Sequence, residues 1–195
     1  QLSGWSEPFV IVAPLRVEAP APDRPAPQAA ESVPVNWQAR ITGGVPPYSY
    51  QFELATGQQQ YFVQQGTKSA WQWRPEQAGR YNIRVTVIDD RGNRQQSDWS
   101  RRYRIVEPLR VSRPQAKNAA EQYPLGAGVT WQSTANGGVG RKTLHFEVEK
   151  QGAEIRTVQS GRSYDWRWHT TEPGFYRVRV QAVDELDNQQ QGDWS

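Results

Sequence analysis

The chain of 195 residues contains no cysteine and no methionine, and it has only two histidines, His145 and His169. Without thiols it can form neither a disulfide nor a thiolate metal site, and it has no cysteine nucleophile. No serine-hydrolase, zinc-protease or phosphate-binding motif occurs in the sequence. These absences predict a chain that is not an enzyme, with no catalytic residue and no resident cofactor.

Long apolar runs and charge clusters of one sign are also missing. No segment approaches the roughly 20 apolar residues of a membrane-spanning helix, so no membrane span is expected in this segment. The 23 Lys and Arg residues stand against 20 Asp and Glu, and they are spread among the acidic residues along the chain. Because nucleic-acid-binding proteins concentrate their cations in one patch or stripe, we expect no nucleic-acid partner.

The chain does contain an internal repeat with a period of 94 to 95 residues. PLRV at 14–17 returns at 108–111, and VNWQARITGGV at 35–45 returns as VTWQSTANGGV at 129–139. All nine tryptophans occupy repeat positions, in the groups Trp5, Trp99 and Trp194; Trp37 and Trp131; Trp71 and Trp166; Trp73 and Trp168. A repeat of this length predicts two domains of immunoglobulin size.

Apolar and polar residues alternate within the repeats, as in YNIRVTV at 81–87 and YRVRVQA at 176–182. Short alternating segments separated by polar turns are typical of an antiparallel sandwich. We therefore expect an all-β chain of two tandem immunoglobulin-like β-sandwiches. The expected segments are 1–13, the last strand of a preceding repeat; 14–107, the first repeat; and 108–195, a second repeat that lacks its last strand.

The end of each repeat, YNIRVTVIDDRGNRQQSDWS and YRVRVQAVDELDNQQQGDWS, resembles the last two strands of fibronectin type III and triple-tyrosine-motif modules. GGVPPYSYQFEL followed by AGRYNIRVTVIDDRGN is similar to PKD-like repeats of bacterial surface proteins. The triple-tyrosine pattern comprises Tyr50, Tyr61 and Tyr81 in the first copy but only Tyr164 and Tyr176 in the second. The resemblance implies a seven-stranded sandwich of immunoglobulin type, located at the cell surface, outside the cell or in the periplasm.

The tripeptide DWS closes both repeats, 15 residues after an arginine in each: Arg84 precedes Trp99, and Arg179 precedes Trp194. Both arginines lie on the outward side of an expected strand, where an antiparallel partner would bring the tryptophan alongside. This resembles the tryptophan–arginine ladder of cytokine-receptor modules with the WSxWS motif. We expect a cation–π clasp across the sheet edge in each repeat.

Two tryptophan pairs, Trp71 with Trp73 and Trp166 with Trp168, are spaced two residues apart, so both rings of a pair lie on one face of a strand. A pair that faces the core fills the sandwich, and its recurrence in both copies favours this interpretation. A pair that faces solvent would form a platform for sugar rings, which is the alternative.

Acidic turns occur at matching positions of the two repeats and contain Asp89 and Asp90 in the first and Asp184 and Asp187 in the second. Their oxygens are ligands that calcium prefers. Aspartate and asparagine also accept local backbone hydrogen bonds in hairpin turns, and neither run has EF-hand spacing. Turn chemistry is therefore the favoured interpretation, and calcium binding is the alternative.

Together these features predict a non-catalytic structural or adhesion spacer of a larger bacterial cell-surface or periplasmic repeat protein. The expected partners are neighbouring repeats of the same chain or other copies of it. The alternative is a glycan-binding accessory module of a secreted enzyme, with a polysaccharide as partner, or a ligand-sensing region of a receptor.

The two ends of the sequence allow two interpretations. Residues 5–13 align with 99–107, and the second repeat stops where its own copy of that strand would begin. The first interpretation is that the 195 residues are a window of a longer chain, in which the missing strand of the second repeat is present. The second is that Phe9, Ile11 and their neighbours donate a strand to the second repeat of another molecule.

Overall fold

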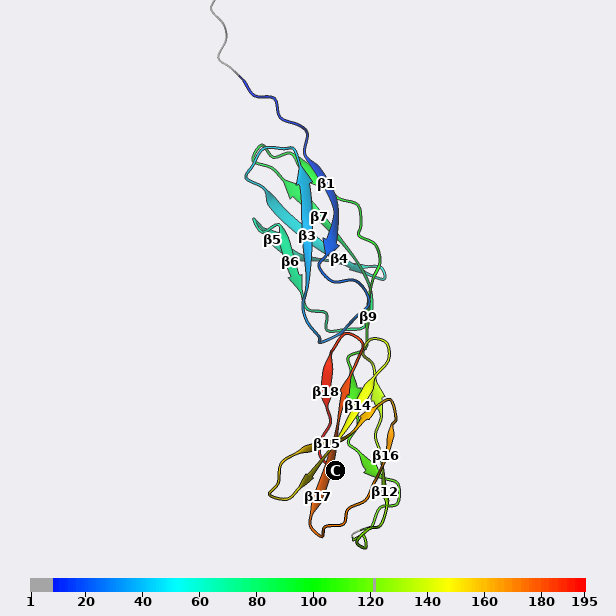
Figure 1. Ribbon diagram of the computed structural model, residues 1–195. Coiled ribbons are helices and arrows are strands. Elements are labelled where there is room, and N and C mark those ends of the chain that lie inside the picture. Colours follow the sequence, from blue (N-terminus) through cyan, green and yellow to red (C-terminus); the bar gives the residue numbers. More distant parts are fainter. Residues whose placement is uncertain (1–8, 121) are drawn as a thin grey trace, which may run out of the picture. The chain divides into compact units, whose positions relative to one another are not determined.

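The computed structural model describes residues 9–120 and 122–195 (Figure 1). Throughout these residues the regular elements are β-strands joined by turns, so the expected all-β fold class is confirmed. Within the same residues, no helix has the length and apolar character needed to cross a membrane.

The chain forms two compact units whose borders do not follow the sequence repeat. Unit 1 consists of the chain up to Pro25 with Pro34–Trp73 and Arg80–Tyr103, and unit 2 consists of Ala26–Val33, Arg74–Gly79 and Arg104–Ser195. Unit 2 thus includes two short segments of the first repeat. The borders expected after residues 13 and 107 stay predictions.

The chain before the first strand has no regular structure where it is described. Residues 1–8 of the expected leading strand lie outside the described residues. Phe9, Val10 and Ile11 are 79 %, 87 % and 84 % exposed, and residues 9–13 belong to no strand. Their proposed role as a donated strand stays a prediction.

The first repeat contains a sheet of order β1-β3-β6 and a sheet of order β2-β9-β7-β4-β5, in which β8 also pairs with β7. The strands of the first sheet are β1 (Arg16–Pro22), β3 (Val35–Thr42) and β6 (Ala70–Trp73). Those of the second are β2 (Gln28–Ala29), β4 (Ser49–Thr56), β5 (Gln59–Gly66), β7 (Gly79–Ile88), β8 (Arg94–Gln96) and β9 (Tyr103–Val106).

The second repeat follows the same plan, with its first sheet divided into two parts. One part is the pair β10 (Arg110–Val111) and β13 (Ala135–Asn136), and the other has the order β11-β12-β16, with β11 (Gln115–Ala116), β12 (Val129–Gln132) and β16 (Asp165–Trp168). The facing sheet has the order β15-β14-β17-β18, with β14 (Thr143–Lys150), β15 (Arg156–Gly161), β17 (Tyr176–Val183) and β18 (Gln189–Gln191). Two tandem immunoglobulin-like sandwiches are therefore present, as expected.

Apolar residues at every second strand position form the core of each repeat. In unit 1 the side chains of Phe52, Ile83 and Val85 are 0 % exposed, and in unit 2 those of Phe146 and Val180 are 0 % exposed. The alternation read from the sequence therefore separates a core face from an outer face in each sheet. The outer face carries the polar cluster that forms the candidate site.

The first glycine of each GGV segment is required by a close backbone approach. Gly43 has φ +68°, and a Cβ there would lie 2.2 Å from the carbonyl oxygen of Pro14. Gly137 has φ +67°, and a Cβ would lie 2.0 Å from that of Pro108. Any side chain at these two positions would clash with the backbone and strain it, so both repeats require glycine there.

Candidate functional site

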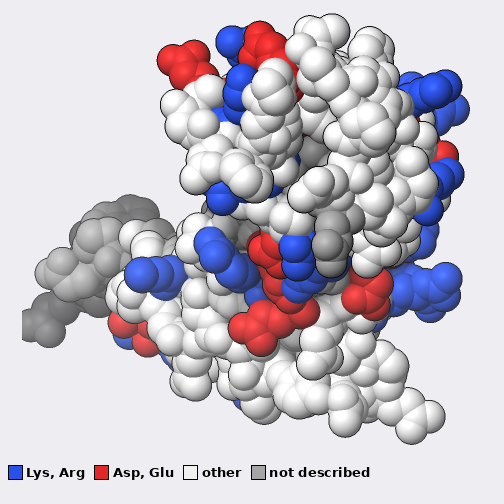
Figure 2. Space-filling model, turned by 90° about the horizontal axis from the view of Figure 1, so that it is seen from below, with Lys and Arg blue, Asp and Glu red and all other residues white. Residues whose placement is uncertain are grey.

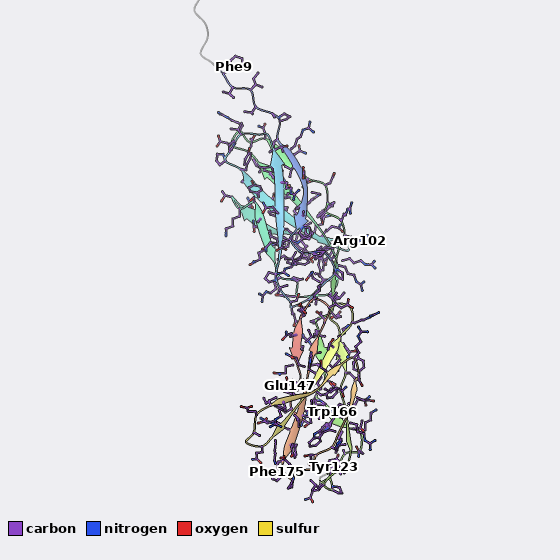
Figure 3. All side chains as sticks on the ribbon, in the orientation of Figure 1. Phe9, Arg102, Tyr123, Glu147, Trp166 and Phe175 are labelled. Atoms are coloured by element: carbon purple, nitrogen blue, oxygen red, sulfur yellow. The ribbon has the colours of Figure 1, made fainter. Side chains whose placement is uncertain are left out.

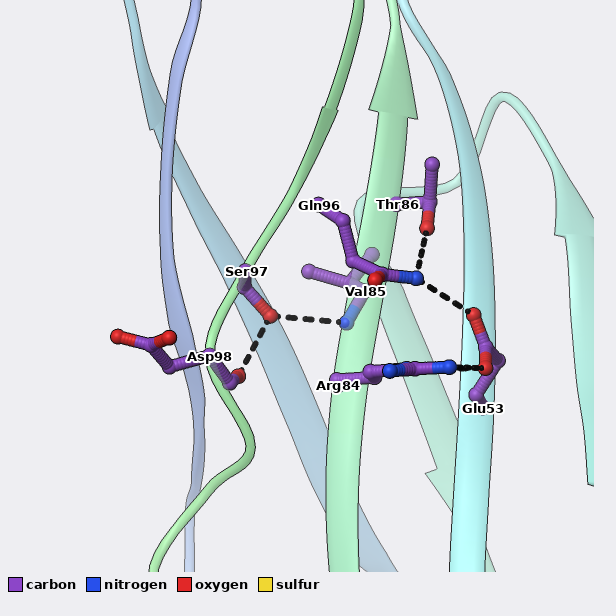
Figure 4. Close-up of polar contacts among 7 residues, drawn as sticks. All are labelled: Glu53, Arg84, Val85, Thr86, Gln96, Ser97 and Asp98. Atoms are coloured by element: carbon purple, nitrogen blue, oxygen red, sulfur yellow. Dashed lines mark hydrogen bonds and ion pairs between the residues drawn. The ribbon is translucent and has the colours of Figure 1, made fainter. Parts of the chain in front are cut away.

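A connected polar cluster of unit 1 lies on the outer face of the β4–β7 pair (Figure 4). Glu53 and Arg84 are direct cross-strand partners, and Glu53 Oε2 accepts from Arg84 Nε at 2.9 Å and from Nη2 at 2.5 Å. Gln96 Nε2 donates to Glu53 Oε1 at 3.1 Å and to Thr86 Oγ1 at 3.0 Å. With Glu53 only 5 % exposed, both of its oxygens are bonded within the sheet.

Trp99 covers the arginine of this cluster. The guanidinium carbon of Arg84 lies 4.3 Å from the centroid of the Trp99 ring. The carboxylate thus holds one edge of the guanidinium while the indole covers one of its faces. A cation–π contact of this kind contributes about 0.5–1 kcal/mol when exposed and about 2 kcal/mol when water is excluded.

The two serines beside Trp99 hold the backbone of the same segment. Ser97 and Ser100 each donate their own N–H to β7, to the carbonyl oxygens of Val85 (2.9 Å) and Ile83 (2.7 Å). In return their Oγ atoms accept the N–H groups of Val85 (3.1 Å) and Ile83 (2.9 Å). The side chains therefore replace a strand ladder, so the chain can bulge at Asp98 and Trp99 without leaving β7 unsatisfied.

Repeat 2 builds the same arrangement with a second arginine. The guanidinium carbons of Arg177 and Arg179 are each 4.4 Å from the Trp194 ring centroid. Arg179 Nε donates to Glu147 at 2.6 Å, and Arg177 forms an ion pair with Glu149. Ser195 Oγ accepts from the N–H of Val178 at 2.9 Å, as Ser100 does in unit 1.

Sequence reasoning identified four residues of these clusters and missed the rest. The structure brings Arg84 to Trp99 and Arg179 to Trp194, as expected. It adds Arg177, whose counterpart in the first repeat is Asn82, a residue that donates to the carbonyl oxygen of Ser100 at 2.8 Å. The missed glutamates carried a readable signal, because Glu53 and Glu147 occupy matching outward positions in the two repeats. We call each set, the tryptophan with its arginines, glutamates and serines, the clasp.

The acidic turns use their carboxylates to bind backbone. Oδ1 of Asp184 accepts the N–H groups of Leu186 (2.9 Å) and Asn188 (3.0 Å), while Oδ2 accepts from Val139 N (2.7 Å) and Asn188 Nδ2 (2.9 Å). Burial raises the pKa of Asp184, but these hydrogen bonds outweigh it and hold the pKa below its ordinary value.

The matching turn of unit 1 repeats this arrangement. Asp89 accepts from Arg91 N, Asn93 N, Asn93 Nδ2 and Val45 N at 2.9–3.0 Å. The hydrogen bond from the Asn93 side chain and those from the backbone hold the pKa of Asp89 below its ordinary value. Asp90 and Asp187 are exposed beside these turns, with Asp187 in a left-handed conformation at φ +59°. The arrangement is the turn chemistry favoured from the sequence, and calcium binding at these residues gains no support from it.

The paired tryptophans point into the core. Trp71 and Trp73 are 8 % and 9 % exposed and stack on each other at 5.8 Å between centroids. Trp166, labelled in Figure 3, is 8 % exposed. Trp168 is half-buried. The pairs therefore face the core, which is the interpretation favoured from the sequence. The rings of Trp71, Trp73 and Trp166 are not available as a platform for sugars.

Some of the charged side chains on the surface are paired with charges of opposite sign. Lys117 bonds Asp165 at 2.7 Å, and Lys150 bonds Glu172 at 2.9 Å. On the face shown in Figure 2, basic and acidic side chains lie next to one another. This mixture offers no argument for a nucleic-acid partner, and the expected absence of one stays a prediction.

The chain is similar to known proteins at the level of solved structures. No family model and no curated protein matches the chain. Among solved structures, it is similar to the fibronectin(III)-like modules of Clostridium thermocellum CbhA, with 17 % identity, coverage of 91 % of this chain and 92 % of that chain, and a TM-score of 0.39. It is also similar to the FN1–FN3 domains of chicken CNTN1, with 12 % identity, coverage of 91 % and 66 %, and a TM-score of 0.41. At this level of similarity, the fold assignment rests on the sheet order of the chain itself.

Proposed function

We propose that the chain is a non-catalytic spacer or adhesion segment of a larger repeat protein of a bacterial cell surface or periplasm. The observation that supports this is the clasp, in which the charged and aromatic side chains are bonded to their own sheet. In unit 1 both oxygens of Glu53 and one face of Arg84 are occupied in this way. A cluster with its polar groups occupied stabilises a domain and leaves little chemistry for a substrate.

The position of the clasp suits a segment that transmits force. In unit 1 it binds the stretch between β8 and β9 to β7, which is the part of the chain that leads out of the first repeat. Pulling on that stretch loads the serine hydrogen bonds and the Trp99–Arg84 contact together. A spacer under tension requires contacts that resist in this way, whereas a catalytic module does not.

Single-molecule stretching of the 195-residue chain tests the proposal. We expect two unfolding steps, each releasing about 31–34 nm of chain, because some 95 residues extend by about 3.3–3.6 Å each. Trp99→Leu should lower the unfolding force of one step and leave the other unchanged. Phe175→Leu, at a position that is 80 % exposed, is the control and should change neither.

Two results would contradict the proposal. One is a Trp99→Leu chain that unfolds at the same forces as the original chain, since the clasp would then carry no load. The other is specific binding of a polysaccharide in affinity electrophoresis, which would favour the glycan-binding accessory module. Neighbouring repeats of the same chain remain the partners that we propose for the spacer.

A further inference from the structure

Strand β5 is an edge strand with an unusual composition. In the sheet order β2-β9-β7-β4-β5 it is the last strand, and within the described part of the chain it pairs with β4 alone. Residues 57–67, GQQQYFVQQGT, contain no charged residue and no proline. Phe62 is 69 % exposed and Tyr61 47 % exposed. An exposed, uncharged edge of this kind is a template for pairing with another strand.

The register shows which backbone groups of β5 point outward. In an antiparallel sheet, the backbone N–H and C=O groups of successive residues point to opposite sides of their strand. The N–H of Val85 on β7 bonds Ser97, so the backbone groups of the neighbouring Arg84 point to the other side, towards Glu53 on β4. Leu54 therefore directs its backbone to its partner Tyr61 on β5. By the same alternation, the backbone groups of Gln60 and Phe62 point away from the sheet, because both residues precede the β-bulge that places Val63 as an extra residue opposite Phe52 and Glu53.

The matching edge of the second repeat is protected. Its strand β15 carries Arg156 opposite Val148, the position that Tyr61 occupies opposite Leu54 in the first repeat. Glu154 and Arg162 lie just outside the two ends of β15, and Thr157 takes the place of Phe62. Charges on an edge strand prevent edge-to-edge pairing, because a second copy would place like charges side by side. β5 has a bulge at the same level as β15, but it carries no charge, so the electrostatic part of this protection is absent from β5.

We propose that β5 pairs antiparallel with β5 of a second copy of this chain, so that the first repeat is a dimerisation surface. Matching the outward groups of Gln60 with those of Phe62 in the other copy places Tyr61 opposite Tyr61 on a two-fold axis. Two-fold pairing places β5 against an identical copy of itself, and because the strand is uncharged, no like charges are brought together. Such an interface is isologous, so it closes at a dimer. It does not depend on the proposed spacer function.

Cysteine cross-linking tests the register, because the chain has no cysteine of its own. Residues that face each other in a non-hydrogen-bonded antiparallel pair have Cα atoms about 4.5 Å apart, within disulfide range. Tyr61→Cys should therefore oxidise to a cross-linked dimer of twice 22.3 kDa. Gln60→Cys is the matched control in the same strand, since its Cα atoms would lie beyond the disulfide limit of about 7 Å. Equal cross-linking of both variants, or of neither, would overturn the proposed pairing.

Sedimentation tests the dimer without a covalent bond. The original chain should shift from monomer to dimer as its concentration rises, and Phe62→Lys should remain monomeric at every concentration. Thr157→Lys is the control, because it adds the same charge at the matching position of β15. Thermal melts should show both variants folded, since the two side chains are exposed. A wild-type chain that stays monomeric, or equal dissociation by both lysine variants, would refute the proposal.

Discussion

At the scale of single residues, each repeat depends on a few polar side chains that accept hydrogen bonds from backbone N–H groups in place of backbone carbonyls. Ser97 and Ser100 accept N–H groups of β7, and Asp89 and Asp184 each accept four N–H groups around a turn. Buried polar groups of this kind are costly to leave unpaired, at about 1–3 kcal/mol each. The stability of the repeats is therefore sensitive to residues that a hydrophobicity profile does not reveal.

Trp99→Leu should lower the free energy of unfolding by about 1–2 kcal/mol, because it removes the ring over Arg84. Urea unfolding followed by circular dichroism measures the change. Asp98→Asn is the control, since the exposed neighbour in the same tripeptide should shift stability by less than about 0.5 kcal/mol. Equal stability of the leucine variant and the original chain would show that the clasp contact is not stabilising.

The lowered pKa of Asp184 predicts a loss of stability in acid. A carboxyl whose folded pKa lies below its unfolded value of about 3.9 stabilises the fold above that value, and the contribution is lost as the pH falls through the folded pKa. Asp184→Asn should therefore be less stable at neutral pH, and the difference should shrink below about pH 4.

Urea unfolding at a series of pH values measures this difference. Asp187→Asn provides the control, because this exposed residue shares the turn and asparagine tolerates its left-handed conformation. A gap between the original chain and Asp184→Asn that is constant down to the most acidic pH would contradict the assignment.

At the scale of elements, the last strand of the first repeat is divided. β8 and β9 flank a stretch without ladder pairing, and the clasp bridges it. Where β9 begins, Tyr103 is 3 % exposed, packs edge-on against Trp37 at 5.2 Å and donates its Oη hydrogen to the carbonyl oxygen of Arg24 at 3.0 Å. The bulge is therefore held at one end by serines and at the other by a buried phenol.

Tyr103 makes this element sensitive to alkali. Burial, with the nearby charge of Asp23, raises the pKa of Tyr103 to about 12. Because the folded pKa lies above the unfolded value of about 10, the stabilisation is complete below pH 10 and is lost as the pH rises towards 12.

Tyr103→Phe should be less stable than the original chain at neutral pH, by about 1 kcal/mol for the lost hydrogen bond. Its stability should fall less steeply above pH 10, as measured by thermal melts across the alkaline range. Burial also raises the pKa values of Tyr50 and Tyr81, and both chains share that effect. Identical slopes in the two chains would rule out Tyr103 as the group responsible.

At the scale of the whole molecule, two copies of one plan have different surfaces. The clasp has one arginine in the first repeat and two in the second, and the matching edge strands carry Tyr61 in one copy and Arg156 in the other. Because the cores are equivalent while the edges are not, the proposed association through β5 belongs to the first repeat alone. The dimer and the spacer functions are thus separable by surface variants that leave each core intact.

The sequence by itself determined the fold class, the duplication and the proximity of Trp99 to Arg84 and of Trp194 to Arg179. These follow from local rules: alternation sets the faces of a strand, and a fixed separation sets what an antiparallel partner brings alongside. The glycine pair at 43–44 and the acidic turns were also readable, because they recur at matching positions.

Only the tertiary structure decided which way the tryptophan pairs point, that Arg177 joins the second clasp, and that the serines take over a strand ladder. The spacing of Trp71 and Trp73 places both rings on one face but does not say which face meets the core, since that depends on the opposing sheet. Edge position is likewise a property of the strand order and not of any segment. The exposure of Tyr61 and Phe62 on β5, and with it the proposed dimer surface, therefore depends on the strand order, in which β4 is the sole neighbour of β5 among residues 9–120 and 122–195.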